Sequence, residues 1–287
     1  MTLNELKRKS LTHISNIPSF KNSWPTYKNR IENIIGVNPS GNDLFKLGDS
    51  LSYIFKPSGG GTSGRSQSNL SSGGTAWECL VVWYLNFIFW NTNVAVAKYK
   101  KEIIPQILRQ AITVGIGNIN SNTESDIVVY GIPNHNSEDS VDEILENNIQ
   151  LCDLSIVQCK TNWNDNSQIP MLWDMIYNSG SASINRVYVG TNGVSPSSFR
   201  NFSYSFFTVP TNTKTKHEST STHVMRVRNL SGGNYWGHPS KTSVASSVKE
   251  YFIRNFSIYF QGSITNHLDN NLNTDPNFIS KFLNLEF

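Results

Sequence analysis

Charged side chains are scarce in this sequence of 287 residues. Asp, Glu, Lys and Arg together make up 16% of it, the formal net charge is +3 and the pI is near 8.6. So small an excess of positive charge permits a polyanionic partner but does not require one. A hydrophobic content of 38%, with 11% aromatic residues, is ordinary for a folded protein and argues against disorder throughout. We therefore expect a folded chain with a largely neutral, polar surface.

Cysteine is also rare, and long apolar runs are missing. Cys79, Cys152 and Cys159 lie in apolar segments, and an odd number in such settings indicates reduced thiols in a cytosolic protein. None belongs to a C-x-x-C pair, which argues against a structural zinc site. The best apolar run, residues 80–90, is too short to cross a bilayer, and residues 1–9 are not followed by the apolar stretch of a secretory signal. We expect a cytoplasmic bacterial protein without a membrane partner.

Several familiar catalytic motifs are absent. The six histidines are scattered without ligand spacing, and no Ser or Cys stands in a nucleophile elbow. The glycine-rich segments 58–64 and 231–233 lack the Lys-Ser ending of a phosphate-binding loop. A P-loop nucleotide hydrolase is therefore not expected.

Hydrophobic periodicity predicts one α/β (α+β) domain over residues 1–287, with a mixed central sheet flanked by helices. Residues 1–75 are expected to hold helices, one of them starting at Ser23 and Pro25, and then a Gly/Ser-rich loop at 58–75. A core follows at 76–192, and residues 193–287 are expected to be a β-rich extension of the sheet. The predicted helices are 76–90 (with Thr75 as N-cap), about 104–113, 169–178 and, as the last one, 244–256. The predicted strands are 126–132, 151–160, 186–190, 205–209 and 222–228.

Five polar residues in this core are the candidates for catalysis. Asp126 opens one apolar strand, Lys160 ends the next, and Asp174 follows in a predicted helix. Hydrolysis of a phosphodiester needs charge neutralisation and an activated water, which a carboxylate-bound magnesium ion and a lysine can supply. Gln158 shares a strand face with Lys160, because side chains two apart point the same way, and could address the metal or the water. Glu78 is the one acid in the apolar helix 76–90.

The order of Asp126 opening one strand and Gln158-Cys159-Lys160 ending the next resembles the PD-(D/E)xK nuclease superfamily, over about residues 76–190. The core of that superfamily is a helix followed by a mixed sheet with a crossover helix, so the resemblance implies a restriction-endonuclease-like core. Ser125 departs from the motif by replacing its proline. Gln158 departs from it by replacing its second acid.

One branch of the type II restriction endonucleases, which cleaves CCGG-centred sites, carries that second acid on the following helix. Asp174 stands where the migrated acid would be, and Glu78 stands where the same branch has a glutamate on its first core helix. The resemblance therefore implies a magnesium-dependent site-specific deoxyribonuclease that cleaves double-stranded DNA. Asp126 and Asp174 would hold Mg²⁺, Lys160 would position the attacking water, and Glu78 would support the site. A homodimer is expected for symmetric sites, and a tetramer is possible.

The segment 212–241 is predicted to contact DNA, because it is basic and carries Glu218 as its one acid. Phosphate contacts give affinity and base-edge contacts give sequence choice. The candidate DNA-binding residues are Arg65 in the Gly/Ser loop and Lys214, Lys216, Arg226, Arg228, Asn229, Asn234, Trp236, His238 and Lys241.

Three alternatives remain open at this stage. Asp153 is a rival acid for the site, although its odd separation from Lys160 places it on the opposite face of a regular strand. A structure-selective or repair nuclease could share the same core. A non-catalytic DNA- or carbohydrate-binding protein would also fit a β-rich C-terminal half.

Overall fold

The structure, a computed structural model, describes residues 1–55, 67–116, 119–121, 125–133, 139–161, 187–209, 235–237 and 248–287. The strands are β1 (Val94–Lys98), β2 (Val114–Ile116), β3 (Ile119–Ser121), β4 (Ile127–Gly131), β5 (Asp153–Lys160), β6 (Val187–Val189), β7 (Asn201–Thr208) and β8 (Tyr235–Gly237). The helices are α1 (Leu3–Ser15), α2 (Pro18–Ile35), α3 (Gly41–Lys46), α4 (Leu51–Phe55), α5 (Gln67–Ile88), α6 (Gln106–Ala111), α7 (Val141–Asn148), α10 (Val248–Phe256), α11 (Ile264–Thr274) and α12 (Phe278–Asn284).

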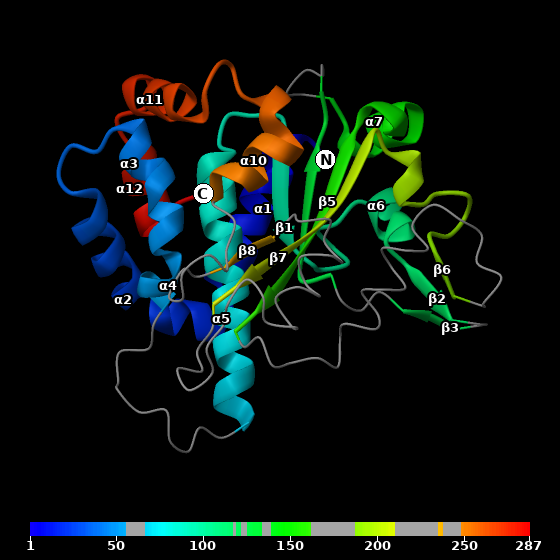
Figure 1. Cartoon of the computed structure of the whole chain (residues 1–287), viewed down its shortest axis with the longest axis horizontal. Helices are drawn as coiled ribbons and strands as arrows, with labels where there is room; N and C mark the ends of the chain where they lie inside the picture. The colour runs from blue at the N-terminus through cyan, green and yellow to red at the C-terminus, as the bar shows by residue number, and fades with distance from the viewer. Residues whose placement is uncertain are drawn as a thin grey trace, which may run out of the picture.

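A five-stranded mixed sheet of order β1-β4-β5-β7-β8 lies at the centre of the molecule (Figure 1). β1, β4 and β5 form an antiparallel meander, β7 then pairs parallel with β5, and β8 pairs parallel with β7. The register places Ile127 opposite Val157, so Asp126, one residue earlier, comes opposite Gln158. The predicted mixed sheet flanked by helices is confirmed.

α5 fills the middle of the core on one face of this sheet. From Ala76 to Phe89 every side chain except Glu78 is buried, as expected of a helix that is apolar on all sides. The helix begins at Gln67, so part of the predicted loop 58–75 is helical, and Thr75 lies inside the helix and is not its N-cap. Gly73 and Gly74 lower helix propensity by about 1 kcal/mol each, and the structure continues the helix in spite of that cost.

The carboxyl end of α5 is closed by side chains from distant parts of the chain. The buried Lys7 donates through Nζ to the carbonyl oxygens of Phe89 (2.9 Å) and Thr92. His267 Nε2 lies 2.8 Å from the carbonyl oxygen of Trp90. A positive charge at a helix C-terminus also interacts favourably with the helix dipole.

The N-terminal and C-terminal helices pack together against the outer side of α5. The indole N–H of Trp24 in α2 donates to the carbonyl oxygen of Leu283 at 3.0 Å. The indole N–H of Trp83 in α5 donates to the carbonyl oxygen of Phe282, also at 3.0 Å. These two bonds fasten α12 to α2 and α5. Helices α2 and α5 pack against each other (Figure 1).

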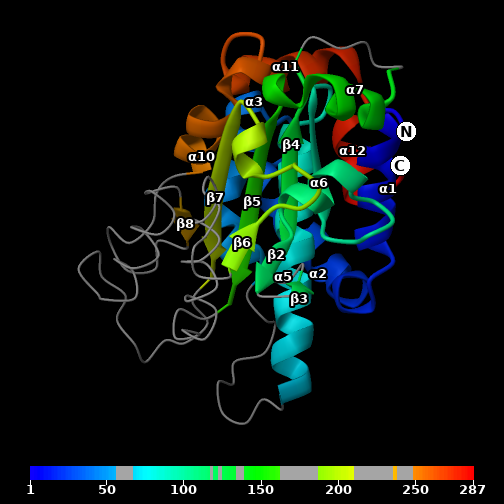
Figure 2. The same ribbon diagram turned by 90° about the vertical axis from the view of Figure 1, so that its right-hand side faces the viewer.

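α6, α7 and a small three-stranded sheet of order β3-β2-β6 cover the other face of the main sheet (Figure 2). Leu108 of α6, Leu145 of α7 and Val114 of β2 are buried there with Val128 and Ile156 of the main sheet. The sequence reading missed β1 and the β2–β3 hairpin. It predicted β6, but not that this strand would join a second sheet.

Two further predictions were wrong. α2 begins at Pro18, so Pro25 lies inside the helix and Ser23 does not start it; Pro18 takes the first helical position, where its missing N–H costs nothing. In the C-terminal part that the structure describes, β7 and β8 extend the sheet, but residues 248–287 form α10, α11 and α12, so 244–256 is not the last helix. The predicted helix 169–178 and strand 222–228 lie outside the described residues. Within the described ranges, no helix has the length and apolar character that a membrane span needs.

Candidate active site

Asp126 lies where β4 begins, and two donors fix its carboxylate. Oδ2 accepts from the backbone N–H of Cys159 at 2.7 Å and from Nε2 of Gln158 at 2.8 Å. Backbone N–H groups of a strand point within the plane of the sheet. The carboxylate of Asp126 therefore accepts a bond that a backbone carbonyl would otherwise accept, and it lies in the plane of the sheet at the end of β4 and β5. Charged groups on either face of the sheet can act on it.

Gln158 connects Asp126 to the neighbouring strand β7. Its side-chain Oε1 accepts from the hydroxyl of Tyr204 at 2.9 Å while its Nε2 donates to Asp126, and its side chain is buried. With both ends of the amide engaged, Gln158 orients the carboxylate of Asp126. The structure does not show Oε1 of Gln158 in position to bind a metal, because this oxygen accepts a hydrogen bond from Tyr204.

Lys160 ends β5 two residues after Gln158 and is partly exposed. The regular register of β5 with β7 keeps Lys160 on the same face as Gln158, as the sequence predicts. The positive charge of Lys160 acts on Asp126 and favours its ionised form. Asp126, Gln158 and Lys160 thus come together at one end of the central strands.

Glu78 approaches from the opposite face, where it forms an ion pair with Lys98. Glu78 projects from α5, Lys98 is the last residue of β1, and their side chains are 16% and 21% exposed. Burial alone would lower the pKa of Lys98, but the charge of Glu78 and the hydrogen bond to it outweigh that effect, and the pKa is raised. Lys98 was not predicted as part of the site, because β1 was not recognised as a strand.

Burial is the main reason that the pKa of Asp126 is raised to about 7, and the negative charge of Glu78 adds to it. Lys160, the N–H of Cys159 and Lys98 act in the other direction and do not offset these two effects. Carboxylates with strongly perturbed pKa values beside a specific charge partner are typical of functional sites.

Asp126 and Glu78 bring two carboxylates to this part of the structure. Magnesium takes oxygen ligands and is usually held by one or two carboxylates, with water and substrate phosphate completing its shell. Asp126 keeps the oxygen that the two N–H donors leave unused, and the carboxylate of Glu78 is near enough to act on it. The hydroxyl of Ser125, buried beside Asp126, has no hydrogen-bond partner among the described residues. In the described part of the chain no three His, Cys, Asp or Glu side chains gather into a metal-binding group, so an all-protein cage is not formed there.

The thiol groups of the three cysteines are not suited to act as nucleophiles or metal ligands. All three are buried and free, as the sequence predicts. Burial raises the pKa of Cys79 and of Cys152 to about 12, and that of Cys159 well above its ordinary value. Thiols in this state are poor nucleophiles and poor metal ligands.

The rival acid Asp153 lies at the other end of β5, opposite Gly131 and not Asp126. It is 3% exposed and forms an ion pair with Arg200, which also lies 3.4 Å from the hydroxyl of Tyr259. This arrangement is that of a structural ion pair, and Asp153 is excluded from the site around Asp126.

Most other candidates lie outside the described residues: Asp174, Arg65, Lys214, Lys216, Arg226, Arg228, Asn229, Asn234, His238 and Lys241. Trp236 is part of β8, whose register places Gly237 opposite Thr208, and Thr208 opposite Lys160. Two strand spacings, about 10 Å, therefore separate the backbone of β8 from that of β5 at the end where Lys160 stands. No protein-family model matches the sequence, and a search of curated proteins finds no match to it.

Proposed function

We propose that this protein is a magnesium-dependent endonuclease that hydrolyses phosphodiester bonds of double-stranded DNA, as a type II restriction enzyme does. The observation that carries the proposal is the carboxylate of Asp126. Its side chain is only partly exposed, its pKa is raised to about 7, and it is oriented by Gln158 and Cys159, which lie within two residues of Lys160 in the sequence. A costly, poorly solvated carboxylate beside a lysine is better explained by chemistry than by stability.

The order of elements supports the resemblance to PD-(D/E)xK nucleases. A long helix, α5, precedes an antiparallel meander of β1, β4 and β5, and β7 then returns parallel to β5. In that arrangement the start of β4 and the end of β5 meet at one edge, which is where Asp126 and Lys160 stand.

The side chains divide the work as follows. Asp126, together with Asp174 on the predicted following helix, would hold the magnesium ion. Gln158 and the Cys159 N–H keep the Asp126 carboxylate in place, and the ammonium of Lys160 orients the attacking water and neutralises charge on the phosphate. Bound magnesium supplies a Lewis acid for the phosphoryl oxygens. Glu78, held by Lys98, adds negative charge that strengthens cation binding.

The test is a digest of phage DNA with and without magnesium, followed by mapping of the product ends. A set of discrete bands with 5′-phosphate ends is expected from the wild type. Lys160→Ala should lower the cleavage rate at least about a hundredfold while DNA binding remains. Lys21→Ala, which removes an exposed lysine of α2, is the matched control and should cleave normally.

Each other outcome has a separate meaning. A smear without preferred ends would point to a structure-selective or repair nuclease with the same site. Unchanged cleavage by Lys160→Ala, or no cleavage by the wild type under any divalent cation, would refute the proposal. Homodimer formation on a symmetric site, measured by light scattering with and without DNA, belongs to the same proposal.

A further inference from the structure

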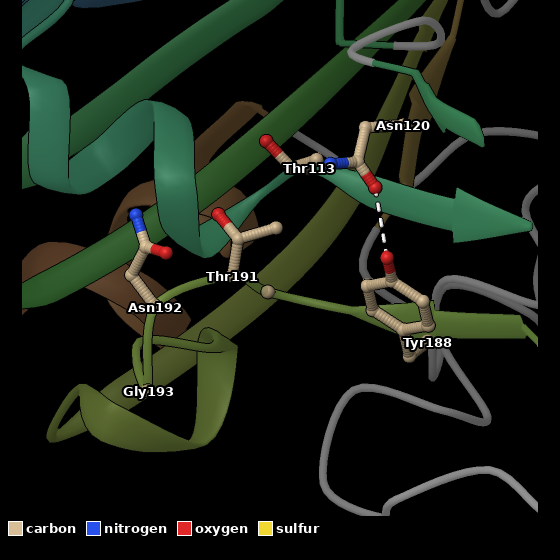
Figure 3. A pocket seen from close by; sticks show the side chains of 7 residues that line it. Thr113, Asn120, Tyr188, Thr191, Asn192 and Gly193 are labelled. Atoms are coloured by element: carbon tan, nitrogen blue, oxygen red, sulfur yellow. Dashed lines mark hydrogen bonds between the residues drawn. The ribbon is translucent and has the colours of Figure 1, made fainter. Parts of the chain in front are cut away.

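A polar pocket of about 670 Å³ opens on the small sheet (Figure 3). Its volume falls in the range of ligand sites, which is about 300–1,000 Å³. The residues that line it are Thr113, Asn120, Tyr188, Gly190, Thr191, Asn192 and Gly193.

A row of three residues across the small sheet builds one wall of the pocket. Gly115 of β2 stands opposite Asn120 of β3 on one side and opposite Tyr188 of β6 on the other. The ring of Tyr188 lies across Gly115, where an added Cβ would come within 2.0 Å of it. The tyrosine thereby reaches over the central strand and donates its hydroxyl to Oδ1 of Asn120 at 2.8 Å. A larger residue at 115 would prevent this contact.

The bond from Tyr188 decides how Asn120 presents its amide. Because Oδ1 is the acceptor, the NH₂ group is left as a pair of donors, and the side chain is exposed on the pocket wall. Across the pocket, backbone bonds from Gly190 to Thr113 (2.8 Å) and from Thr191 to Gln110 (3.1 Å) fasten the opposite rim to the end of α6. That rim carries the exposed amide of Asn192 (Figure 3).

The described residues that line the pocket are all neutral. They include no Lys, Arg, Asp or Glu, so they do not supply the charge that would recognise a phosphate or a cation. They offer amide donors and acceptors, hydroxyls and one aromatic ring. These are the groups that recognise the edge of a nucleobase, and the two N–H donors of Asn120 match the acceptor atoms N7 and O6 of guanine.

The pocket lies on the side of the main sheet that carries Gln158. Val114 and Val189 of the small sheet belong to the same buried cluster as Tyr204, the partner of Gln158. Asn120 and Asp126 are six positions apart in the sequence, so their Cα atoms are at most about 20 Å apart. That distance corresponds to about six base-pair steps of 3.4 Å.

We propose that this pocket receives the edge of a nucleobase, with guanine preferred, at a position near the scissile phosphate. The inference rests on the proposed nuclease function and assigns it a part in sequence choice. The amide of Asn120, held by Tyr188, reads the base edge from one wall, and Asn192 does so from the other.

The experiment measures base preference without cleavage. Full-length protein in EDTA is mixed with a duplex pool of randomised sequence, and bound DNA is sequenced. Asn120→Ala should reduce the preference at one position about tenfold to a hundredfold, with little change in total DNA bound. Gly115→Ala should give the same loss although it removes no polar group, because its new methyl group displaces Tyr188. Asn38→Ala, at an exposed asparagine between α2 and α3, is the matched control and should behave as wild type.

A single-stranded pool is measured in parallel. A loss confined to duplex DNA identifies a base edge read in a groove, and a loss on single strands as well identifies an unpaired base; either supports the proposal. Wild-type preference in both Asn120→Ala and Gly115→Ala refutes it, and a urea titration of each variant verifies that it is folded. If the wild type cleaves DNA in magnesium but these variants keep its base preference, the pocket proposal alone fails. If the wild type neither cleaves nor prefers any sequence, the proposed function fails with it.

Discussion

Asp126→Asn is expected to make the folded protein more stable and to abolish DNA cleavage. The asparagine carbonyl oxygen can accept from the Cys159 N–H and from Gln158 as Oδ2 does, so both hydrogen bonds survive. What disappears is a negative charge that is poorly solvated and close to Glu78. Sites built for chemistry often store instability of this kind.

The magnitude follows from the pKa of Asp126. In the unfolded chain its ordinary value is 3.8, and in the folded protein it is about 7. Between these values the folded state binds the proton that the unfolded state has lost, so the free energy of unfolding of the wild type falls as pH rises through this window. At about 1.36 kcal/mol for each pH unit the ceiling is roughly 4 kcal/mol, and about 2 kcal/mol is expected because the side chain is partly exposed.

The assay is urea unfolding followed by tryptophan fluorescence at several pH values between about 4 and 8. The variant should exceed the wild type in free energy of unfolding at pH 8, and the difference should shrink toward zero near pH 4. Magnesium should stabilise the wild type, by about 2.7 kcal/mol at a hundredfold excess over its Kd, and should have much less effect on the variant. A difference that does not change with pH, or a variant less stable than wild type at pH 8, would refute the reasoning.

Three other substitutions test separate parts of the structure. Burial lowers the pKa of Lys7 from 10.5 to about 7. Between these pH values the unfolded chain still binds the proton that the folded protein has lost, so the free energy of unfolding of the wild type should rise with pH. Lys7→Met should lack that rise, and parallel curves of stability against pH would contradict the lowered pKa of Lys7. Phe252→Ala should lower the free energy of unfolding by about 3–5 kcal/mol, because the fully buried ring packs against five aromatic rings. A loss under about 1 kcal/mol in a urea titration would contradict that packing. Asp153→Asn should lower the free energy of unfolding by about 1 kcal/mol, because the ion pair with the partly exposed Arg200 becomes a neutral hydrogen bond, yet magnesium-dependent cleavage should be kept. An inactive but folded variant would return Asp153 to the active site.

The long apolar segments could be predicted from the sequence because burial on every side leaves an unmistakable pattern. The strand period of two also placed Gln158 and Lys160 on one face and Asp153 on the other, and the contacts of Gln158 with Tyr204 and of Asp153 with Arg200 agree with it. These are local properties of a regular strand.

What could not be predicted depends on contacts between distant segments. Lys98 matters because α5 crosses β1 and brings Glu78 to it, which no local pattern records. β1 itself carries two alanines, which are not typical of strands, and the three-residue strands β2 and β3 are too short to show a period. α11 is rich in Asn and Thr, residues of low helix propensity, and is held in place by buried Leu268 and His267.

The two indole bonds to α12 bear on how the protein is made. Trp24 and Trp83 cannot form these two bonds until residues 282 and 283 have been synthesised and have reached them. A nascent chain halted earlier would keep α2 and α5 with an uncovered aromatic surface, a ready target for chaperones and proteases. Incomplete products carrying the residues proposed for DNA cleavage would then be exposed to degradation.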